Sequence, residues 1–277
     1  MNADGAWIGC VAGVTLAGCL VGSVSAQTSR AFYRIELETH WTSAEHGSAY
    51  TPGAHFSWPV GMIHSDGASM WEPGGIASPG LELMAEAGRG ITLFENAEAF
   101  VDQGLASEAI SGRGLQAEDT YAWNRWFSTE HHRLTLVFMI APSPDWFVGT
   151  HGLSLVDSEG EWIDEIVIPL EAYDSGTDSG LEFVSANADT QPPEPIRSIQ
   201  FEPPFDGVSA IATMRLILQS VEECPADLNQ DGQLTPADFN AWVQAFNARS
   251  DAADQNGDGA IDPADFNAWV INFNAGC

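Results

Sequence analysis

Apolar residues between positions 30 and 221 recur in short runs separated by turn-forming segments, a spacing typical of β-strands. The run 134–140 is the strongest strand candidate, because it is continuously apolar or β-branched and Pro142 follows it. A mixed helical spacing over 81–100 predicts one helix. Many strands with one helix favour an antiparallel β-sandwich. The other expected strands are 32–37, 165–170 and 214–218, and turn-rich segments lie at 72–75 and 174–180.

A different pattern begins near residue 222. Each residue of 225–248 has a counterpart 27 positions later in 252–275, and both copies contain the sequence PADFNAWV. Each copy places four apolar side chains at i, i+3, i+4 and i+7, which is one face of a helix. We therefore expect a small helical module over 224–277 with these side chains in its core. They are Phe239, Trp242, Val243 and Phe246 in the first copy and Phe266, Trp269, Val270 and Phe273 in the second.

A loop with the pattern D-x-N-x-D-G and an acid at position twelve precedes each helix, at 227–238 (loop one) and 254–265 (loop two). Calcium takes about six to eight hard oxygen ligands, and such a loop supplies them from positions one, three, five and twelve and from the carbonyl of position seven. The sequence predicts one calcium ion in each loop. The expected ligands are Asp227, Asn229, Asp231, Gln233 and Asp238 in loop one, and Asp254, Asn256, Asp258, Ala260, Asp262 and Asp265 in loop two.

Neither loop follows a pattern for a full helix, whereas each loop of an ordinary EF-hand pair lies between two helices. Two loop–helix units in this order resemble the dockerin family, and the resemblance covers 224–277. It implies two calcium ions, folding on calcium binding and docking to a cohesin-like domain. The chain departs from well-known dockerins at Pro236-Ala237 and Pro263-Ala264, where those proteins often carry hydroxyl residues that contact cohesin.

The charge balance excludes some partners. The chain has 39 acidic residues against nine basic ones, all of them Arg, and a formal net charge of −30. Such a chain cannot neutralise nucleic-acid phosphates or bind an anionic membrane surface. It suits divalent cations as ligands and remains soluble in salty water. With 44% hydrophobic residues it can also bury a sizeable core.

The N-terminal segment has the features of an export signal. Residues 8–24 are nearly free of polar side chains, and small residues end at Ala26, just before Gln27. The pattern predicts a signal peptide over 1–26 and a secreted or cell-surface protein that is not transmembrane after processing. No Lys or Arg precedes the apolar run, which departs from an ordinary signal. Leu16-Ala17-Gly18-Cys19 leaves a bacterial lipoprotein signal as an alternative.

Two of the four cysteines, Cys10 and Cys19, lie in this segment. The other two, Cys224 and Cys277, bracket the C-terminal module. In an exported chain this placement favours one disulfide, with two free thiols as the alternative.

Three stretches of the large domain carry a second resemblance. They are HFSWPVGMIHSDGASMWEPGGIASPGLELMAEAG at 55–88, PSPDWFVGTHGLSL at 142–155 and YDSGTDSGLEF at 173–183. In this order they resemble the spondin N-terminal domain of the F-spondin and mindin family, over about 30–221. The SPDW and DSGTDSG pieces are specific, whereas Ser57-Trp58-Pro59 departs from the family, which usually places proline directly after serine.

The spondin resemblance implies a C2-like β-sandwich with one calcium ion between loops at one end, held by Asp145, Asp174 and Asp178. The residues agree with it, because Asp174 and Asp178 lie in a Gly/Ser-rich turn and Asp145 follows Pro144. Carboxylates without Cys or paired His suit calcium better than zinc. The alternative is that these aspartates only cap turns.

The resemblance also implies function, since spondin domains bind matrix, receptors or microbial surfaces. We therefore expect a secreted, non-enzymatic adhesion or extracellular-matrix-type protein whose ligand is an extracellular protein or polysaccharide. The sequence contains no G-x-S-x-G, H-E-x-x-H, phosphate-loop or dinucleotide-binding motif. The alternatives are a dockerin-borne polysaccharide-degrading enzyme, since two acids suffice for a glycosidase, and a structural surface-layer or biofilm component.

Overall fold

The computed structural model describes residues 29–275 except 230, 232, 257 and 258. The predicted signal segment 1–26, the expected ligand Asp258 and the expected disulfide partner Cys277 lie outside the described residues. None of the helices in the described part of the chain is long and apolar enough to cross a membrane.

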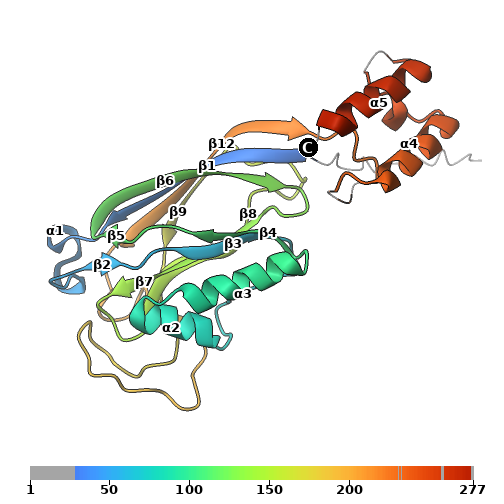
Figure 1. Ribbon diagram of the computed structural model, residues 1–277. Coiled ribbons are helices and arrows are strands. Elements are labelled where there is room, and N and C mark those ends of the chain that lie inside the picture. The colour runs from blue at the N-terminus through green and yellow to red at the C-terminus, as the bar shows by residue number, and fades with distance from the viewer. Residues whose placement is uncertain (1–28, 230, 232, 257–258, 276–277) are drawn as a thin grey trace, which may run out of the picture.

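The large domain consists of two antiparallel β-sheets, as the sequence predicts (Figure 1). The first sheet has the strand order β6–β1–β12–β9. Its strands are Glu118–Ser128, Ser29–His40, Ala212–Glu223 and Glu165–Leu170. The chain reverses after β1 through a short helix, α1 (Ser43–His46), and a 3-10 turn, η1 (Gly47–Ala49).

The second sheet has the order β11–β10–β8–β7–β2–β5, and β3 pairs with both β7 and β4. In that order the strands are Arg197–Ser198, Ala172–Asp174, Trp146–Ser154, Arg133–Ala141, His55–Phe56 and Leu115–Gln116, with β3 at Val60–His64 and β4 at Ala106–Ser111. The expected strands at 32–37, 134–140, 165–170 and 214–218 are therefore confirmed, each inside an observed strand.

Strand β7 lies between two apolar layers. Leu134, Leu136 and Phe138 belong to the core between the two sheets, whereas Val137 and Met139 belong to a second core beneath the helices. This two-sided burial explains why the strand is apolar at consecutive positions. Strand β1 instead alternates, with Ala31, Tyr33, Ile35 and Leu37 buried toward the core between the sheets.

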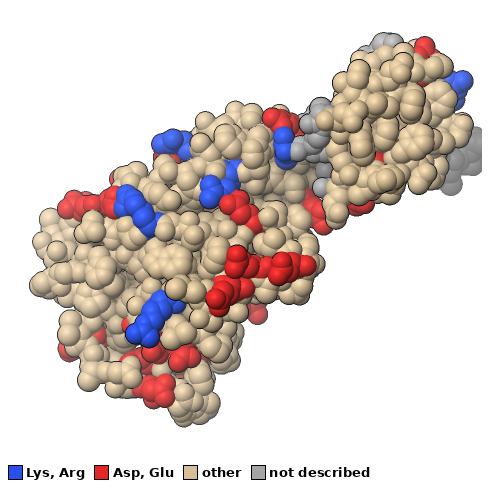
Figure 2. All heavy atoms as spheres, in the orientation of Figure 1, with Lys and Arg blue, Asp and Glu red and all other residues tan. Residues whose placement is uncertain are grey.

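Two helices, α2 (Pro79–Ala87) and α3 (Ile91–Asp102), cover the outer face of the second sheet (Figure 1). The sequence predicted one helix here, and this prediction is wrong because Gly88 adopts a left-handed conformation, with φ 64°, and ends α2. Figure 2 shows acidic side chains gathered over α3, whose exposed acids are Glu95, Glu98 and Asp102.

The C-terminal module contains α4 (Pro236–Ala248), a 3-10 turn η2 (Asp251–Ala253) and α5 (Pro263–Ala275). Its two tryptophans donate equivalent hydrogen bonds to the backbone. Trp242 Nε1 donates to the Ala253 carbonyl at 3.3 Å, and Trp269 Nε1 donates to the Ala226 carbonyl at 3.1 Å. Each helix is thereby tied to the residue that directly precedes the other helix's loop.

The expectation for the aromatic residues of this module is only partly confirmed. Trp242 and Trp269 are buried, but Phe239 and Phe266 are 37% and 40% exposed. Their ring centroids lie 5.9 Å apart, where the two helices meet. The apolar face of each helix is wider than this small core can cover. The first apolar residue of each face, Phe239 or Phe266, therefore stays partly exposed.

Cys224 is buried and disulfide-bonded. This excludes a free thiol at this position. Its pairing with Cys277 stays a prediction.

Candidate metal centres

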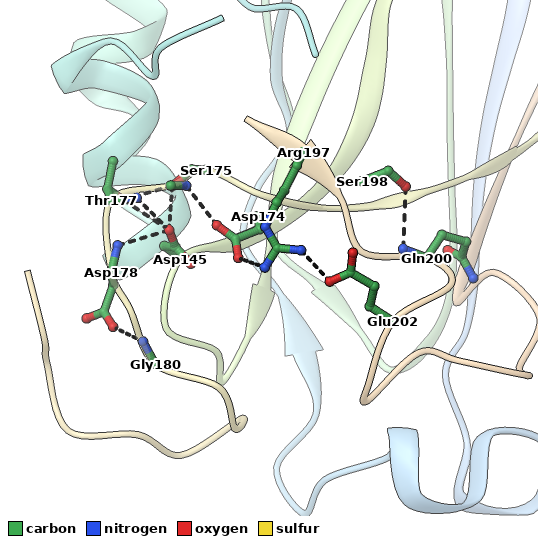
Figure 3. A network of polar contacts seen from close by, with 11 residues as sticks. Asp145, Asp174, Ser175, Thr177, Asp178, Gly180, Arg197, Ser198, Gln200 and Glu202 are labelled. Atoms are coloured by element: carbon green, nitrogen blue, oxygen red, sulfur yellow. Dashed lines mark hydrogen bonds and ion pairs between the residues drawn. The ribbon is translucent and has the colours of Figure 1, made fainter. Parts of the chain in front are cut away.

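Asp145 directly precedes β8, and its side chain is fully buried. Its Oδ2 accepts hydrogen bonds from the loop after β10. The donors are the backbone N–H groups of Thr177 at 2.8 Å and Asp178 at 3.0 Å, and the hydroxyls of Ser175 at 3.0 Å and Thr177 at 3.4 Å. Figure 3 shows these groups converging on the Asp145 carboxylate. One buried carboxylate therefore organises the whole turn.

The turn has this shape because of Gly176, whose φ is +77°. A Cβ at this position would lie 2.1 Å from the Glu194 carbonyl oxygen, so only glycine fits. The Gly176 carbonyl accepts from Glu194 N–H at 2.8 Å, and the Thr177 carbonyl accepts from Thr190 N–H at 2.8 Å. The segment that returns toward β11 therefore holds the loop in place, with its N–H groups directed at Asp145.

The other two expected ligands lie in the same loop but face other partners. Asp178 accepts hydrogen bonds from the N–H groups of Gly180 at 2.7 Å and Ala188 at 2.8 Å, and Figure 3 shows its carboxylate directed away from Asp145. Asp174 accepts from Arg197 Nη2 at 2.9 Å. The ligand oxygens of Asp145, Asp174 and Asp178 do not all lie within 4.8 Å of one another. Their role as calcium ligands stays a prediction.

Two carboxylate oxygens at this site are buried without a hydrogen-bond partner among the described residues: Asp145 Oδ1 and Glu86 Oε1. Glu86 lies on α2, and Asp145 and Asp178 both act electrostatically on it. Buried oxygens without a donor are costly unless a cation binds them. The residues present therefore fit a hard cation.

Sequence reasoning missed Glu86. A glutamate on an amphipathic helix is normally solvated, and nothing in its neighbourhood along the chain distinguishes it from Glu82. Only the packing of α2 against the second sheet brings it to the loop after β10.

The electrostatics reflect an excess of negative charge. Burial and then the neighbouring Asp145 raise the pKa of Asp174 to about 6, although Arg197 opposes the rise. Burial also raises the pKa of Glu86; a hydrogen bond from the Thr177 side chain to this carboxylate opposes the rise, and Glu82, Asp178 and Asp145 add smaller increases. Both shifts mean that the site disfavours its own ionised carboxylates.

In loop one, the carboxylate at position twelve connects the loop to its helix. Asp238 is fully buried, and its Oδ2 accepts from Thr235 N–H at 2.8 Å in a capping box that begins α4. Its Oδ1 accepts from Asn229 N–H at 3.3 Å. At positions five and seven of the loop, Gln233 N–H donates to Asp231 Oδ1 at 2.9 Å.

Loop two has the same arrangement. Asp265 is fully buried, and its two oxygens accept from the N–H groups of Gln255 at 3.0 Å and Asp262 at 2.8 Å. Gly259 has φ 79°, and its N–H donates to Asp254 Oδ2 at 2.8 Å. Asp254, Asn256 and Ala260 lie in this loop as expected by sequence position. Both loops thus curl their backbone around a buried acid at position twelve.

Fold and motifs together define a two-part protein, an antiparallel β-sandwich followed by an EF-hand-type module. The Spondin_N profile matches residues 31–214, and an EF-hand profile matches residues 251–271. The chain therefore belongs to the spondin family through its N-terminal domain. The EF-hand match supports calcium binding at the C-terminus. The dockerin-type assignment of 224–277 stays a prediction.

Curated relatives agree with the family. Spondin-2 of Rattus norvegicus is 32% identical over 212 residues, which are 72% of this chain and 62% of the relative. Spondin-2 of Homo sapiens is 31% identical over 212 residues, with the same coverage. Spondin-1 of Homo sapiens is 29% identical over 218 residues, which are 69% of this chain and 26% of the relative. The matched part therefore spans less than two thirds of each of these relatives.

The raised pKa of Asp174 predicts a pH-dependent stability in calcium-free buffer. Because the folded-state pKa of about 6 exceeds the ordinary value of 3.8, this group's contribution is full below 3.8 and is lost as the pH rises through about 6. Thermal unfolding of the protein in EDTA should show a smaller decrease across this window in Asp174→Asn than in the parent chain. Parallel stability curves for the two proteins would contradict the assignment.

Proposed function

We propose that this protein is an extracellular, calcium-dependent binding protein. In the proposal the spondin domain holds one calcium ion beside Asp145, the C-terminal module holds two, and the spondin domain recognises an extracellular protein or polysaccharide. The observation that carries the proposal is the pair of buried, unpartnered oxygens at the Asp145 cluster, Asp145 Oδ1 and Glu86 Oε1. Family membership supports the same conclusion.

Charge at the cluster favours a divalent ion. The acids Glu86, Asp145, Asp174 and Asp178 lie near enough to interact electrostatically. Among the described residues, the cation in an ion pair with one of them is Arg197, which also pairs with Glu202. Partly uncompensated carboxylates in a buried site are unfavourable. Calcium tolerates an irregular oxygen shell that includes backbone carbonyls and water, so it does not require all carboxylates to meet at one point.

The ligand set proposed for this ion therefore differs from the set that the motifs imply. Asp145 Oδ1 and Glu86 Oε1 contribute without breaking an existing hydrogen bond among the described residues. Asp174 and Asp178 contribute only after their carboxylates turn from Arg197 and from the N–H groups of Gly180 and Ala188. The ion would link α2, the start of β8 and the loop after β10.

The C-terminal module is the second calcium-binding part of the proposal. Strand β12 precedes loop one, whereas α4 and η2 precede loop two, so the expectation of no preceding helix holds for loop one and not for loop two. The succession of two loop–helix units supports the dockerin-type hypothesis, in which the module docks to a cohesin-like domain. The exposed Phe239 and Phe266 would then be available for contact.

Glu86 gives the sharpest test of the calcium ion in the spondin domain. Saturating calcium should raise the melting temperature of the parent protein, because a ligand that binds only the folded state stabilises it by about 2.7 kcal/mol at a hundredfold excess over Kd. Glu86→Gln should lose most of this increase, and in EDTA it should be no less stable than the parent, because it removes a carboxylate whose pKa is raised by burial. Glu95→Gln, an exposed acid on α3, is the matched control and should behave as the parent. If Glu86→Gln keeps the full calcium response, this site is wrong.

The loops of the module are expected to differ in affinity. Loop two carries Asp262 where loop one has Thr235, and more ligand charge generally tightens calcium binding. Equilibrium dialysis of the full chain with radioactive calcium should find the tighter module site lost in Asp254→Ala and the weaker one lost in Asp227→Ala. Equal losses in both variants would refute the predicted order.

The binding function itself is tested with an array of extracellular polysaccharides, matrix proteins and a cohesin domain. Capture should require calcium and should fail in EDTA. A turnover assay on the same polysaccharides distinguishes a binder from a polysaccharide-degrading enzyme. Release of reducing sugar by the parent protein would overturn the non-enzymatic assignment, and capture by cohesin alone would place recognition in the module.

A further inference from the structure

Three side chains at the end of β1 form a cluster that the calcium chemistry does not use. Within the described part of the chain, His40, Glu45 and His46 are the one group of at least three His, Cys, Asp or Glu residues whose ligand atoms all lie within 4.8 Å of one another. We propose that this cluster is a binding site for a divalent transition-metal ion, best suited to Zn²⁺. The proposal is independent of the calcium sites.

The local fold holds His40 and α1, which carries Glu45 and His46, in place. His40 is the last residue of β1, and its backbone N–H donates to the Ile211 carbonyl at 3.1 Å. The adjacent Trp41 is fully buried, and its Nε1 donates to the Ala49 carbonyl at 2.6 Å. Thr42 caps α1 by accepting from Glu45 N–H at 3.2 Å, which directs the single turn of helix back over His40.

His40 has one ring nitrogen bonded to the protein, whereas His46 has contacts at both, of which the one at Nε2 is long enough for a metal ion to replace it. His40 Nε2 lies 3.1 Å from Thr213 Oγ1 on β12, so Nδ1 faces the cluster, 3.9 Å from Glu45 Oε2. His46 Nδ1 lies 3.2 Å from both the backbone nitrogen and the carbonyl oxygen of Thr42, and its Nε2 has a long contact of 3.5 Å with Ser209 Oγ. A second nitrogen held by a protein oxygen is the arrangement that orients histidine as a metal ligand.

Burial and ligand type select the ion. His46 is fully buried, whereas the Glu45 side chain is 61% exposed and that of His40 is 31% exposed. Two nitrogen ligands and one carboxylate suit Zn²⁺ and similar ions, whereas calcium requires oxygen. A tetrahedral zinc shell needs ligand atoms about 3.3 Å apart, given bonds of about 2.0 Å. The exposed Glu45 can rotate inward to close the remaining gap, and the fourth position faces solvent.

The test is metal binding by the untagged full chain in saturating calcium, so that the acidic loops are occupied. Equilibrium dialysis against Zn²⁺ with elemental analysis should find one zinc ion per chain. Co²⁺ should give the intense visible absorption of a four-coordinate site. Glu45→Gln, which alters only an exposed carboxylate, and His40→Gln should each weaken zinc binding at least tenfold. Thr213→Val, which removes the partner of His40 Nε2, should weaken it by about 10- to 100-fold.

His55→Gln is the matched control, because His55 is exposed and its side chain, among the described residues, bonds only to the Gly53 carbonyl. It should bind zinc as the parent does. His46→Gln should abolish zinc binding if this variant folds, and the Glu45 and His40 variants decide the question if it does not. The proposal is overturned if Glu45→Gln and His40→Gln bind zinc like the parent, if His55→Gln loses binding, or if excess calcium displaces the zinc.

Discussion

Strand β7 has apolar side chains on both faces, so it is stable only where a separate layer covers each of them. The first sheet covers one face, and α2 with α3 cover the other. Because β8 pairs directly with β7, the residue just before β8 lies at the end of this three-layer stack. Asp145 occupies that position, and it acts electrostatically on Glu86 of α2. The layering of the core thus sets the position of the candidate metal centre.

The candidate centre is polar in a part of the protein where polarity is costly. Asp145 is fully buried, and its Oδ2 is satisfied by a turn that exists only because Gly176 tolerates a left-handed conformation. Its other oxygen has no donor among the described residues. A buried carboxylate with one unpartnered oxygen favours a bound cation, because the cation offsets the remaining desolvation cost. The raised pKa values of Asp174 and Glu86 have the same origin, which is burial of negative charge that the protein only partly compensates.

The C-terminal module also contains buried carboxylates, one in each copy of its repeat. Each copy of the repeat provides a loop with a buried acid at position twelve and a helix whose tryptophan binds the backbone before the other loop. Neither half can bury its apolar face alone, because a single helix has no second helix to pack against. A helix this short is also only marginally stable by itself. The exposed Phe239 and Phe266 mark where that shared core ends. The two loops and the packing of the two helices are therefore linked through the same few residues.

The sequence by itself determined the layout of the chain. Alternation and continuous apolar runs identified the strands, since side-chain direction in a strand has a period of two. The repeat identified the two loops and helices, because calcium ligation uses residues close together in sequence. The spondin motifs identified Asp145, Asp174 and Asp178 as neighbours, and the structure brings them to one region. Tertiary structure alone decided which oxygens lack partners, how Glu86 joins them, and how His40 and His46 come to share a site with Glu45. The physical reason is that the burial of a side chain and its distance from another depend on how the sheets and helices pack, and local sequence patterns do not specify that packing.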